Sequence, residues 1–196
     1  SNTIFKCDLY DPEGDVPEFN GITYDDYKAG QDIASDDSKA QSDVFNTWTL
    51  HAGTFVSGQK KGQGIRMAKA RPHSLAVLTV LPDGAEEEER VITAVFLVDR
   101  SYEGDEETPA WVQNTETKYR MKFTEDEAFD LKLWRYYSNQ TNPERIRMGS
   151  GIFRYIDDVQ SAHILRAIAD LLKGTDREEQ AQHFYEHYCQ LNQLDP

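Results

Sequence analysis

Two continuous apolar runs near the middle of the chain constrain its fold more than any other feature of the sequence. They span residues 75–81 and 91–98, and their length and β-branched content are typical of strands in a core. A Pro-Asp-Gly turn sequence and a run of four glutamates separate them. The pattern therefore predicts a hairpin of two buried strands with an extended, solvated tip.

Further strands are expected on both sides of this hairpin. Residues 48–56 are rich in β-formers and alternate loosely between apolar and polar side chains, and residues 118–123 alternate more regularly. A loop rich in Gly and Lys, residues 57–64, follows the first of these strands.

Helices are expected in the last third of the chain. Thr124 and Glu127 form an S/T-x-x-E capping box, which predicts a helix from there to Tyr137 with Leu131 and Trp134 on its buried face. Two more helices should follow, one capped by Asp157 or Asp158 and ended by Gly174, and one opened by a second capping box, Thr175 with Glu178. Strands thus come first and helices gather late, without βαβ alternation. The sequence predicts the α+β class, with a mostly antiparallel sheet or partial barrel and a C-terminal helical hairpin.

The first 46 residues differ in composition from the rest of the chain. Residues 8–46 are rich in Asp, Gly, Ser and Pro and contain only scattered aromatic side chains, which favours an extended, partly ordered arm. The expected organisation is an acidic N-terminal arm at 1–46, a core at 47–156 and a helical hairpin at 157–196 packed on the core. A chain that begins near residue 46 is predicted to stay folded.

Charge is distributed unevenly along the sequence. The net charge of −14 by itself disfavours nucleic acid or an anionic membrane as a partner. Residues 47–81, however, carry five basic and no acidic side chains, whereas residues 1–46 carry 11 acidic and 3 basic, and residues 82–113 carry 10 and 2. This wholly basic segment weakens the objection to nucleic acid. A solvated basic loop that balances its acidic neighbours is the alternative interpretation.

Several classes of protein are not expected. No apolar run approaches the roughly 20 residues of a membrane-spanning helix, and the first residues lack the apolar segment of a signal peptide. The two cysteines, Cys7 and Cys189, can form one disulfide at most. We therefore expect a reduced, cytoplasmic protein with no membrane partner.

One motif points to metal chemistry. His183, Glu186 and His187 match H-x-x-E-H, in which two histidines one helical turn apart hold Zn²⁺ and the glutamate acts as a base. That site needs a third protein ligand well downstream, and nine residues follow His187. We interpret the histidines as a solvated pair beside an apolar stripe and predict no tight zinc site. A structural site that adds Cys189 is the alternative.

Other catalytic patterns are weak, and no cofactor is expected. The glycine-rich loop at 57–64 lacks the P-loop pattern because its lysines precede the last glycines. Asp130 and Lys132 have the local spacing of a nuclease site, but they lie in a predicted helix rather than on a strand. A small metal-dependent hydrolase or nuclease is therefore kept only as an alternative.

Aromatic and basic residues interleave between residues 134 and 155. This stretch contains four arginines and one acidic residue, and arginine planes and aromatic faces can stack a base and hold a phosphate. Burial preference places Trp48 and Trp134 in the core. Tyr136 or Tyr137 is then the candidate to face a groove.

The segment 47–156 resembles PUA-like domains, including EVE and YTH-type modules. The shared features are an early strand tryptophan (Trp48), a basic Gly loop, paired apolar strands with the sequence Val95-Phe96-Leu97-Val98 and aromatic residues in the connecting helix. The resemblance implies a compact pseudo-barrel whose pocket receives a flipped or modified base between aromatic side chains. It makes Trp48, Trp111 and Trp134 the candidates for the pocket wall, and Lys60, Lys61, Arg66, Lys69 and Arg71 the candidates for phosphate binding.

We therefore expect a non-catalytic binding module that recognises a nucleic acid base or a nucleotide, rather than an enzyme. The two basic stretches are predicted to converge on one face. The C-terminal helices are expected to offer a surface to a protein partner, and a protein-interaction domain of a stress or defence system is a further alternative. The predicted binding residues are Trp48, Lys60, Lys61, Arg66, Lys69, Arg71, Trp111, Trp134, Tyr137, Arg145, Arg147 and Arg154.

Overall fold

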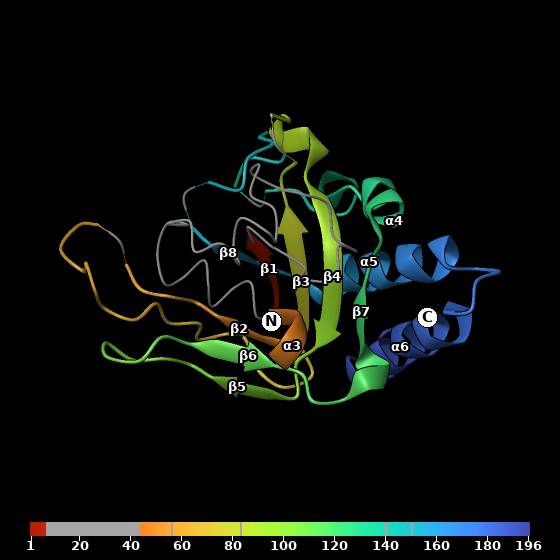
Figure 1. Ribbon diagram of the computed structural model, residues 1–196, viewed down its shortest axis with the longest axis horizontal. Helices are drawn as coiled ribbons and strands as arrows, with labels where there is room; N and C mark the ends of the chain where they lie inside the picture. Colours follow the sequence, from red (N-terminus) through yellow and green to blue (C-terminus); the bar gives the residue numbers. More distant parts are fainter. Residues whose placement is uncertain (7–43, 56, 83, 140, 150) are drawn as a thin grey trace, which may run out of the picture.

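A five-stranded sheet lies at the centre of the fold (Figure 1), in the order β7-β4-β3-β1-β8. The computed structural model describes residues 1–6, 44–55, 57–82, 84–139, 141–149 and 151–196. β1 runs parallel to β3, and the other neighbouring strands are antiparallel. The strands are β1 (Asn2–Lys6), β3 (Leu75–Val80), β4 (Val91–Leu97), β7 (Arg120–Lys122) and β8 (Phe153–Ile156).

The predicted central hairpin is formed by β3 and β4. Every residue of both strands is buried, and the pairing begins with Leu75 opposite Leu97. The connection contains a short 3₁₀ helix, η1 (Glu87–Glu89), and Arg90 pairs with Glu87 at 2.7 Å at its end. The two apolar runs therefore form core strands, as expected.

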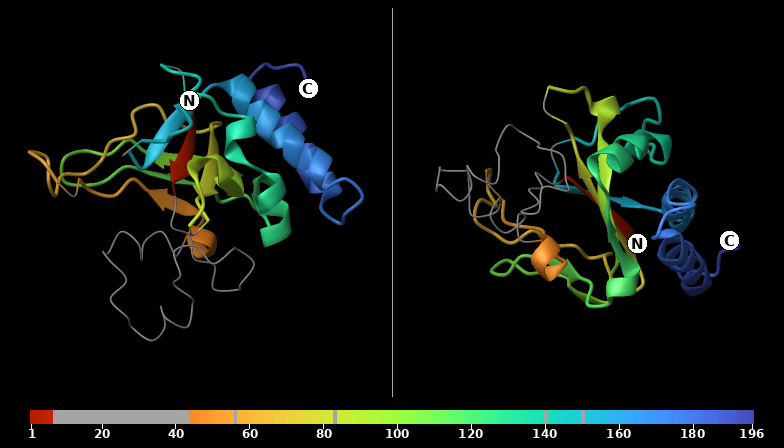
Figure 2. Two further views of the ribbon diagram at one scale, coloured as in Figure 1. Left: turned by 90° about the horizontal axis from the view of Figure 1, so that it is seen from above. Right: turned by 45° about the vertical axis from the view of Figure 1, so that its right-hand side comes forward.

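A second, three-stranded sheet lies on one side of the central sheet (Figure 2). Its order is β2 (Thr49–His51), β6 (Trp111–Gln113) and β5 (Arg100–Tyr102), with the single-turn helix α3 (Val44–Thr47) just before β2. β2 is shorter than the strand predicted at 48–56. Trp48, with a φ of +47°, turns the chain before β2, and after His51 the chain leaves this sheet, with Thr54 in an isolated bridge to Gly64.

Helices α5 (Asp158–Leu171) and α6 (Glu178–Leu191) pack side by side on the opposite face of the central sheet (Figures 1 and 2). Asp157 caps α5, since its Oδ1 accepts a hydrogen bond from the Gln160 amide at 2.7 Å. The start of α6 differs from the prediction: the Glu178 carboxylate accepts from the Gly174 amide at 2.8 Å, and the helix begins only at Glu178. In the described part of the chain, no helix is long and apolar enough to cross a membrane.

The helix predicted from Thr124 to Tyr137 is much shorter in the structure. The capping box of Thr124 and Glu127 is confirmed, but α4 (Glu125–Asp130) ends after six residues. The reason is competition for backbone hydrogen bonds: the Leu131 carbonyl accepts from Ile92, and the Leu133 amide donates to Arg90, both at 2.9 Å. The chain then forms a single 3₁₀ turn, η3 (Leu133–Arg135).

The first strand overturns part of the expected domain organisation. Residues 2–6 were predicted to belong to the N-terminal arm, yet β1 pairs with both β3 and β8 inside the central sheet. The boundary at residue 46 is therefore wrong for these residues, while 7–43 lie outside the described residues. The α+β class is confirmed, and the two sheets of the described part do not close into a barrel.

Candidate functional site

The basic segment 47–81 contacts the aromatic and basic segment 134–155 at β8, through Lys69 and Tyr155. The Lys69 ammonium lies 5.5 Å from the centre of the Tyr155 ring, and the Lys69 amide donates a hydrogen bond of 3.3 Å to the Tyr155 hydroxyl. Lys69 belongs to the basic segment 47–81 and Tyr155 to the aromatic and basic segment 134–155. The structure thus joins segments that are 86 residues apart in sequence.

Arg154, the preceding residue of β8, is held in one orientation. Its Nη1 donates to the Phe153 carbonyl at 2.8 Å, and its guanidinium lies against two glycines. A Cβ atom at Gly149 or Gly151 would come within 2.6 or 2.5 Å of a guanidinium nitrogen. The absence of a Cβ at these glycines leaves room for the guanidinium in this position, where its remaining N–H groups can act as donors.

Tyr137, a predicted binding residue, lies near this arginine, and Trp134 packs beside Tyr137. The rings of Trp134 and Tyr137 are 5.4 Å apart, centre to centre. Burial raises the pKa of the Tyr137 phenol, and the positive charge of Arg154 opposes that rise. The indole N–H of Trp134 is buried without a hydrogen-bond partner among the described residues. We define the β8 site as Lys69, Trp134, Tyr137, Arg154 and Tyr155.

The β8 site wraps around the edge of the central sheet. β8 is the edge strand, and successive side chains of a strand point to opposite faces. Arg154 therefore lies on one face with Tyr137, and Tyr155 on the other with Lys69. Lys6, at the end of β1, reaches the same edge, where its ammonium donates to the Gly149 carbonyl at 2.5 Å.

Lys6 and Tyr155 were not among the predicted site residues. Lys6 was assigned to the arm on composition, and only the pairing of β1 with β8 reveals its place. Tyr155 follows Phe153 and Arg154 in an alternating pattern that is typical of a strand. On sequence alone, we interpret this pattern only as part of an aromatic and basic binding stretch.

The three predicted tryptophans lie in different environments. Trp48 is buried and contacts Phe96 edge-on at 6.1 Å, with the Arg120 guanidinium 5.1 Å from its ring centre. Trp111 is half-buried on β6 beside Tyr102. Trp134, half-buried on η3, packs against the core. Of the three, Trp134 belongs to the β8 site.

The predicted convergence of the two basic stretches on one face is wrong for the remaining basic residues, which are spread over other parts of the surface. Lys60, Lys61 and Arg66 follow β2 in a loop that extends away from the central sheet (Figures 1 and 2). Within that loop Arg66 forms an ion pair with Glu103, and Lys60 lies over the Phe55 ring. Exposed positions are also taken by Arg71, just before β3, and by Arg145 and Arg147, in the loop that leads from η3 towards β8.

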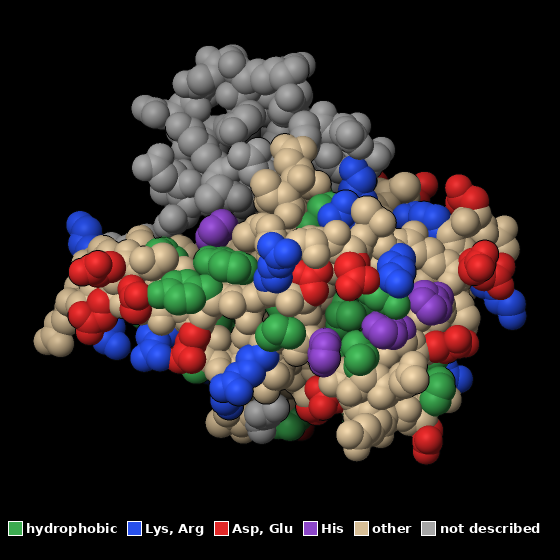
Figure 3. Space-filling view, turned by 90° about the horizontal axis from the view of Figure 1, so that it is seen from below, with side chains coloured by type: hydrophobic (Ala, Val, Ile, Leu, Met, Phe, Trp, Pro, Cys, Tyr) green, Lys and Arg blue, Asp and Glu red, His purple; other side chains and the backbone are tan. Residues whose placement is uncertain are grey.

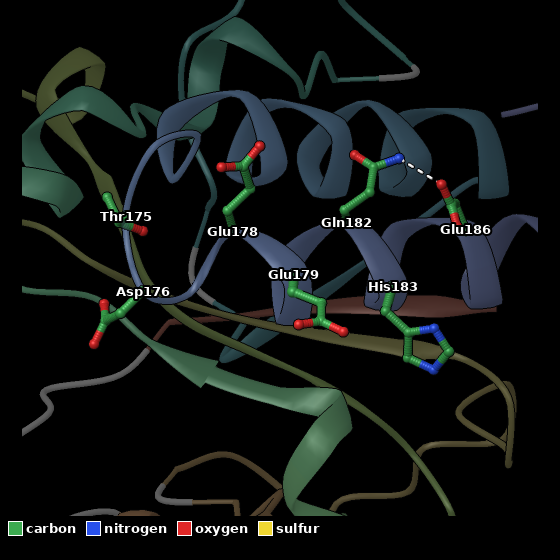
Figure 4. A pocket seen from close by; sticks show the side chains of 7 residues that line it. All are labelled: Thr175, Asp176, Glu178, Glu179, Gln182, His183 and Glu186. Atoms are coloured by element: carbon green, nitrogen blue, oxygen red, sulfur yellow. Dashed lines mark hydrogen bonds between the residues drawn. The ribbon is translucent and has the colours of Figure 1, made fainter.

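The H-x-x-E-H motif lies on the surface of α6. His183 and His187 both stack near Tyr119 of the 3₁₀ helix η2 (Thr117–Tyr119). A shallow depression beside the start of α6 is lined by His183 and by acidic residues, with Gln182 bonded to Glu186 (Figure 4). Among the described residues, no group of three or more His, Cys, Asp or Glu side chains is placed to hold a metal ion.

Comparisons with known proteins give no relative from which a function could be transferred. No family model, no curated protein and no solved structure matches the chain.

Proposed function

We propose that the chain is a non-catalytic module that binds a nucleic acid base or a nucleotide at the β8 site. The observation that carries this proposal is the contact of Lys69 with Tyr155, because it joins the two basic stretches of an acidic protein beside half-buried aromatic rings. The PUA-like resemblance, which implies base recognition by aromatic side chains, agrees with the same proposal.

The chemistry of the site suits an oligonucleotide that passes around the edge of the sheet, with a phosphate at Arg154 on one face of β8 and a base at Tyr155 on the other. A guanidinium already held by a hydrogen bond binds phosphate with less further loss of side-chain entropy, and Arg154 donates to the Phe153 carbonyl beside two glycines. Base stacking on an aromatic ring contributes about 1–3 kcal/mol per base. Tyr155, half-buried on the strand edge, is the ring we assign to stacking.

An unpaired base is the expected ligand. Stacking on Tyr155 needs access to the face of a base, and a base inside a duplex has both faces covered by its neighbours. The proposal therefore predicts tighter binding of single-stranded than of duplex oligonucleotides.

Fluorescence anisotropy with short labelled oligonucleotides at low salt tests the proposal. Lys69→Glu and Arg154→Gln should each weaken binding about tenfold or more, since each removes a charge-assisted contact. Arg154→Lys should fall between wild type and Arg154→Gln, because it keeps the charge but loses the planar donors. The logarithm of affinity should fall with the logarithm of salt at a slope of about −0.7 per phosphate contacted.

Lys173→Glu is the matched control. Lys173 is exposed after the end of α5, so the variant makes the same change in net charge away from β8 and should retain binding within about twofold of wild type. No binding of any oligonucleotide at low salt, or an equal loss in Lys173→Glu, would reject the proposal.

A further inference from the structure

Helix α6 is attached to η2 through a stack of aromatic and histidine rings. The His187 ring lies 4.3 Å from the Tyr119 ring, centre to centre, and the planes differ by 9°. The His183 ring lies 5.7 Å from the same ring, and its Nε2 is 3.3 Å from the Tyr119 hydroxyl. Lys118 places its ammonium 4.9 Å from the centre of that ring. Histidine side chains gather beside Lys and Arg on this face of the molecule (Figure 3).

The polar contacts that Gln180 of α6 and Arg177, its N-cap residue, make with this region involve no histidine. The Gln180 amide donates to the carbonyls of Thr117 and Arg120, at 3.2 and 3.1 Å. Arg177 donates to the Lys122 carbonyl at 2.8 Å. The groups in these contacts do not change protonation near neutral pH. The stack between α6 and η2, in contrast, contains two histidine rings.

Basic groups outnumber acidic ones around the His187 ring. The groups that act on it are His183 on α6, Lys118 and Glu116 on and beside η2, and His73 before β3. Glu116 is the carboxylate among these groups, and it lies 3.9 Å from the Lys118 ammonium. Burial, with His183 and Lys118 nearby, lowers the pKa of His187. The Tyr119 ring offers an imidazolium little compensation, because the Lys118 ammonium already interacts with it.

We propose that His187 is a pH-sensitive contact, neutral when α6 is docked on η2, and that its protonation loosens α6. Because His187 binds a proton more weakly in the docked state than in the undocked state, lowering the pH favours the undocked state. Docking is therefore strongest above the ordinary histidine pKa of 6.5. Docking weakens as the pH falls from 6.5 through the lowered pKa of the docked His187. Each unit by which docking lowers this pKa changes the opening equilibrium tenfold.

Amide hydrogen exchange of α6, followed by mass spectrometry and corrected for the intrinsic effect of pH, tests this proposal on the full chain. Protection of α6 should fall severalfold to tenfold between about pH 7.5 and 5.5, while protection of the β3–β4 hairpin should change much less. His187→Gln should remove most of this pH dependence. Lys118→Gln should reduce it, since it removes a neighbouring cation but leaves His187 in place.

His163→Gln is the matched control, because His163 is an exposed histidine on the neighbouring helix α5. This variant should show the same pH dependence as wild type. If α6 stays equally protected over the whole range, or if His187→Gln and Lys118→Gln both keep the full wild-type pH dependence, the proposal is wrong. An equal loss of protection in the β3–β4 hairpin would also overturn it, because the opening would then be global.

Discussion

Replacement of Asn2 by alanine should destabilise the fold far more than its place near the start of the chain suggests. The side chain of Asn2 is completely buried. Its Oδ1 accepts hydrogen bonds from the Leu75 amide at 2.7 Å and from the Tyr188 hydroxyl at 3.0 Å, and its Nδ2 donates to Asp158 at 2.8 Å. One side chain thus connects β1 with β3, α5 and α6.

The three lost hydrogen bonds have unequal costs. The Leu75 amide would be left buried without an acceptor, which costs about 1–3 kcal/mol. The Tyr188 hydroxyl is equally buried but also interacts with Ser161. Loss of its hydrogen bond to Asn2 therefore costs less, about 1 kcal/mol. Asp158 is exposed, and water can replace Asn2 there. We therefore expect Asn2→Ala to lower the free energy of unfolding by about 2–4 kcal/mol.

Urea unfolding at neutral pH, with Tyr188→Phe and the double variant, checks both the size and the origin of this effect. Tyr188→Phe removes one donor and should cost about 1 kcal/mol. Because both single variants remove the same hydrogen bond, the double variant should be less destabilised than the sum, by about 1 kcal/mol. A loss below about 1 kcal/mol for Asn2→Ala, or strict additivity of the two changes, would show that this network is not what holds β1.

Two further predictions concern β1 and the second sheet. Deletion of residues 1–6 removes an internal strand and should abolish cooperative thermal unfolding followed by circular dichroism; a melt like that of the full chain would show that β1 is dispensable. Gly64→Ala should lower the free energy of unfolding by about 1–3 kcal/mol, because a Cβ there would lie 2.5 Å from the Asp105 carbonyl oxygen and 2.9 Å from the Pro109 nitrogen, both backbone atoms. Gly58→Ala is its control: a Cβ meets nothing within 4 Å, so the positive φ of +80° should cost only about 1 kcal/mol. Equal denaturation midpoints for the two glycine variants would contradict this account.

The parts of the fold that were predictable depend on local sequence. The β3–β4 hairpin follows from two long apolar runs with a turn between them, and its strands are buried throughout. The capping box of Thr124 and Glu127 likewise depends on residues three apart, and both of its hydrogen bonds are present. In each case the deciding interactions lie within one element or its immediate neighbour.

The parts that were missed depend on partners distant in sequence. β1 is five residues long and contains the buried polar residues Asn2 and Thr3, so no hydrophobic pattern marks it as a core strand. Its neighbours β3 and β8 begin more than 70 residues further along the chain. Similarly, α4 ends early because Arg90, just before β4, and Ile92, within it, take the hydrogen bonds of Leu133 and Leu131, which no helix pattern could indicate.

β1 also explains why the candidate site was only partly predictable from the sequence. Composition identified Lys69 and Arg154 as members of two basic stretches, but β1 is the element that positions both of them. Arg154 pairs with Ile4 in the sheet, and Tyr155, which contacts Lys69, pairs with Thr3. Loss of β1 would therefore remove the β8 site together with the sheet. A chain that begins at residue 46 thus cannot distinguish a loss of folding from a loss of binding. Single substitutions on β8, in a chain that retains residues 1–6, are the changes that can separate them.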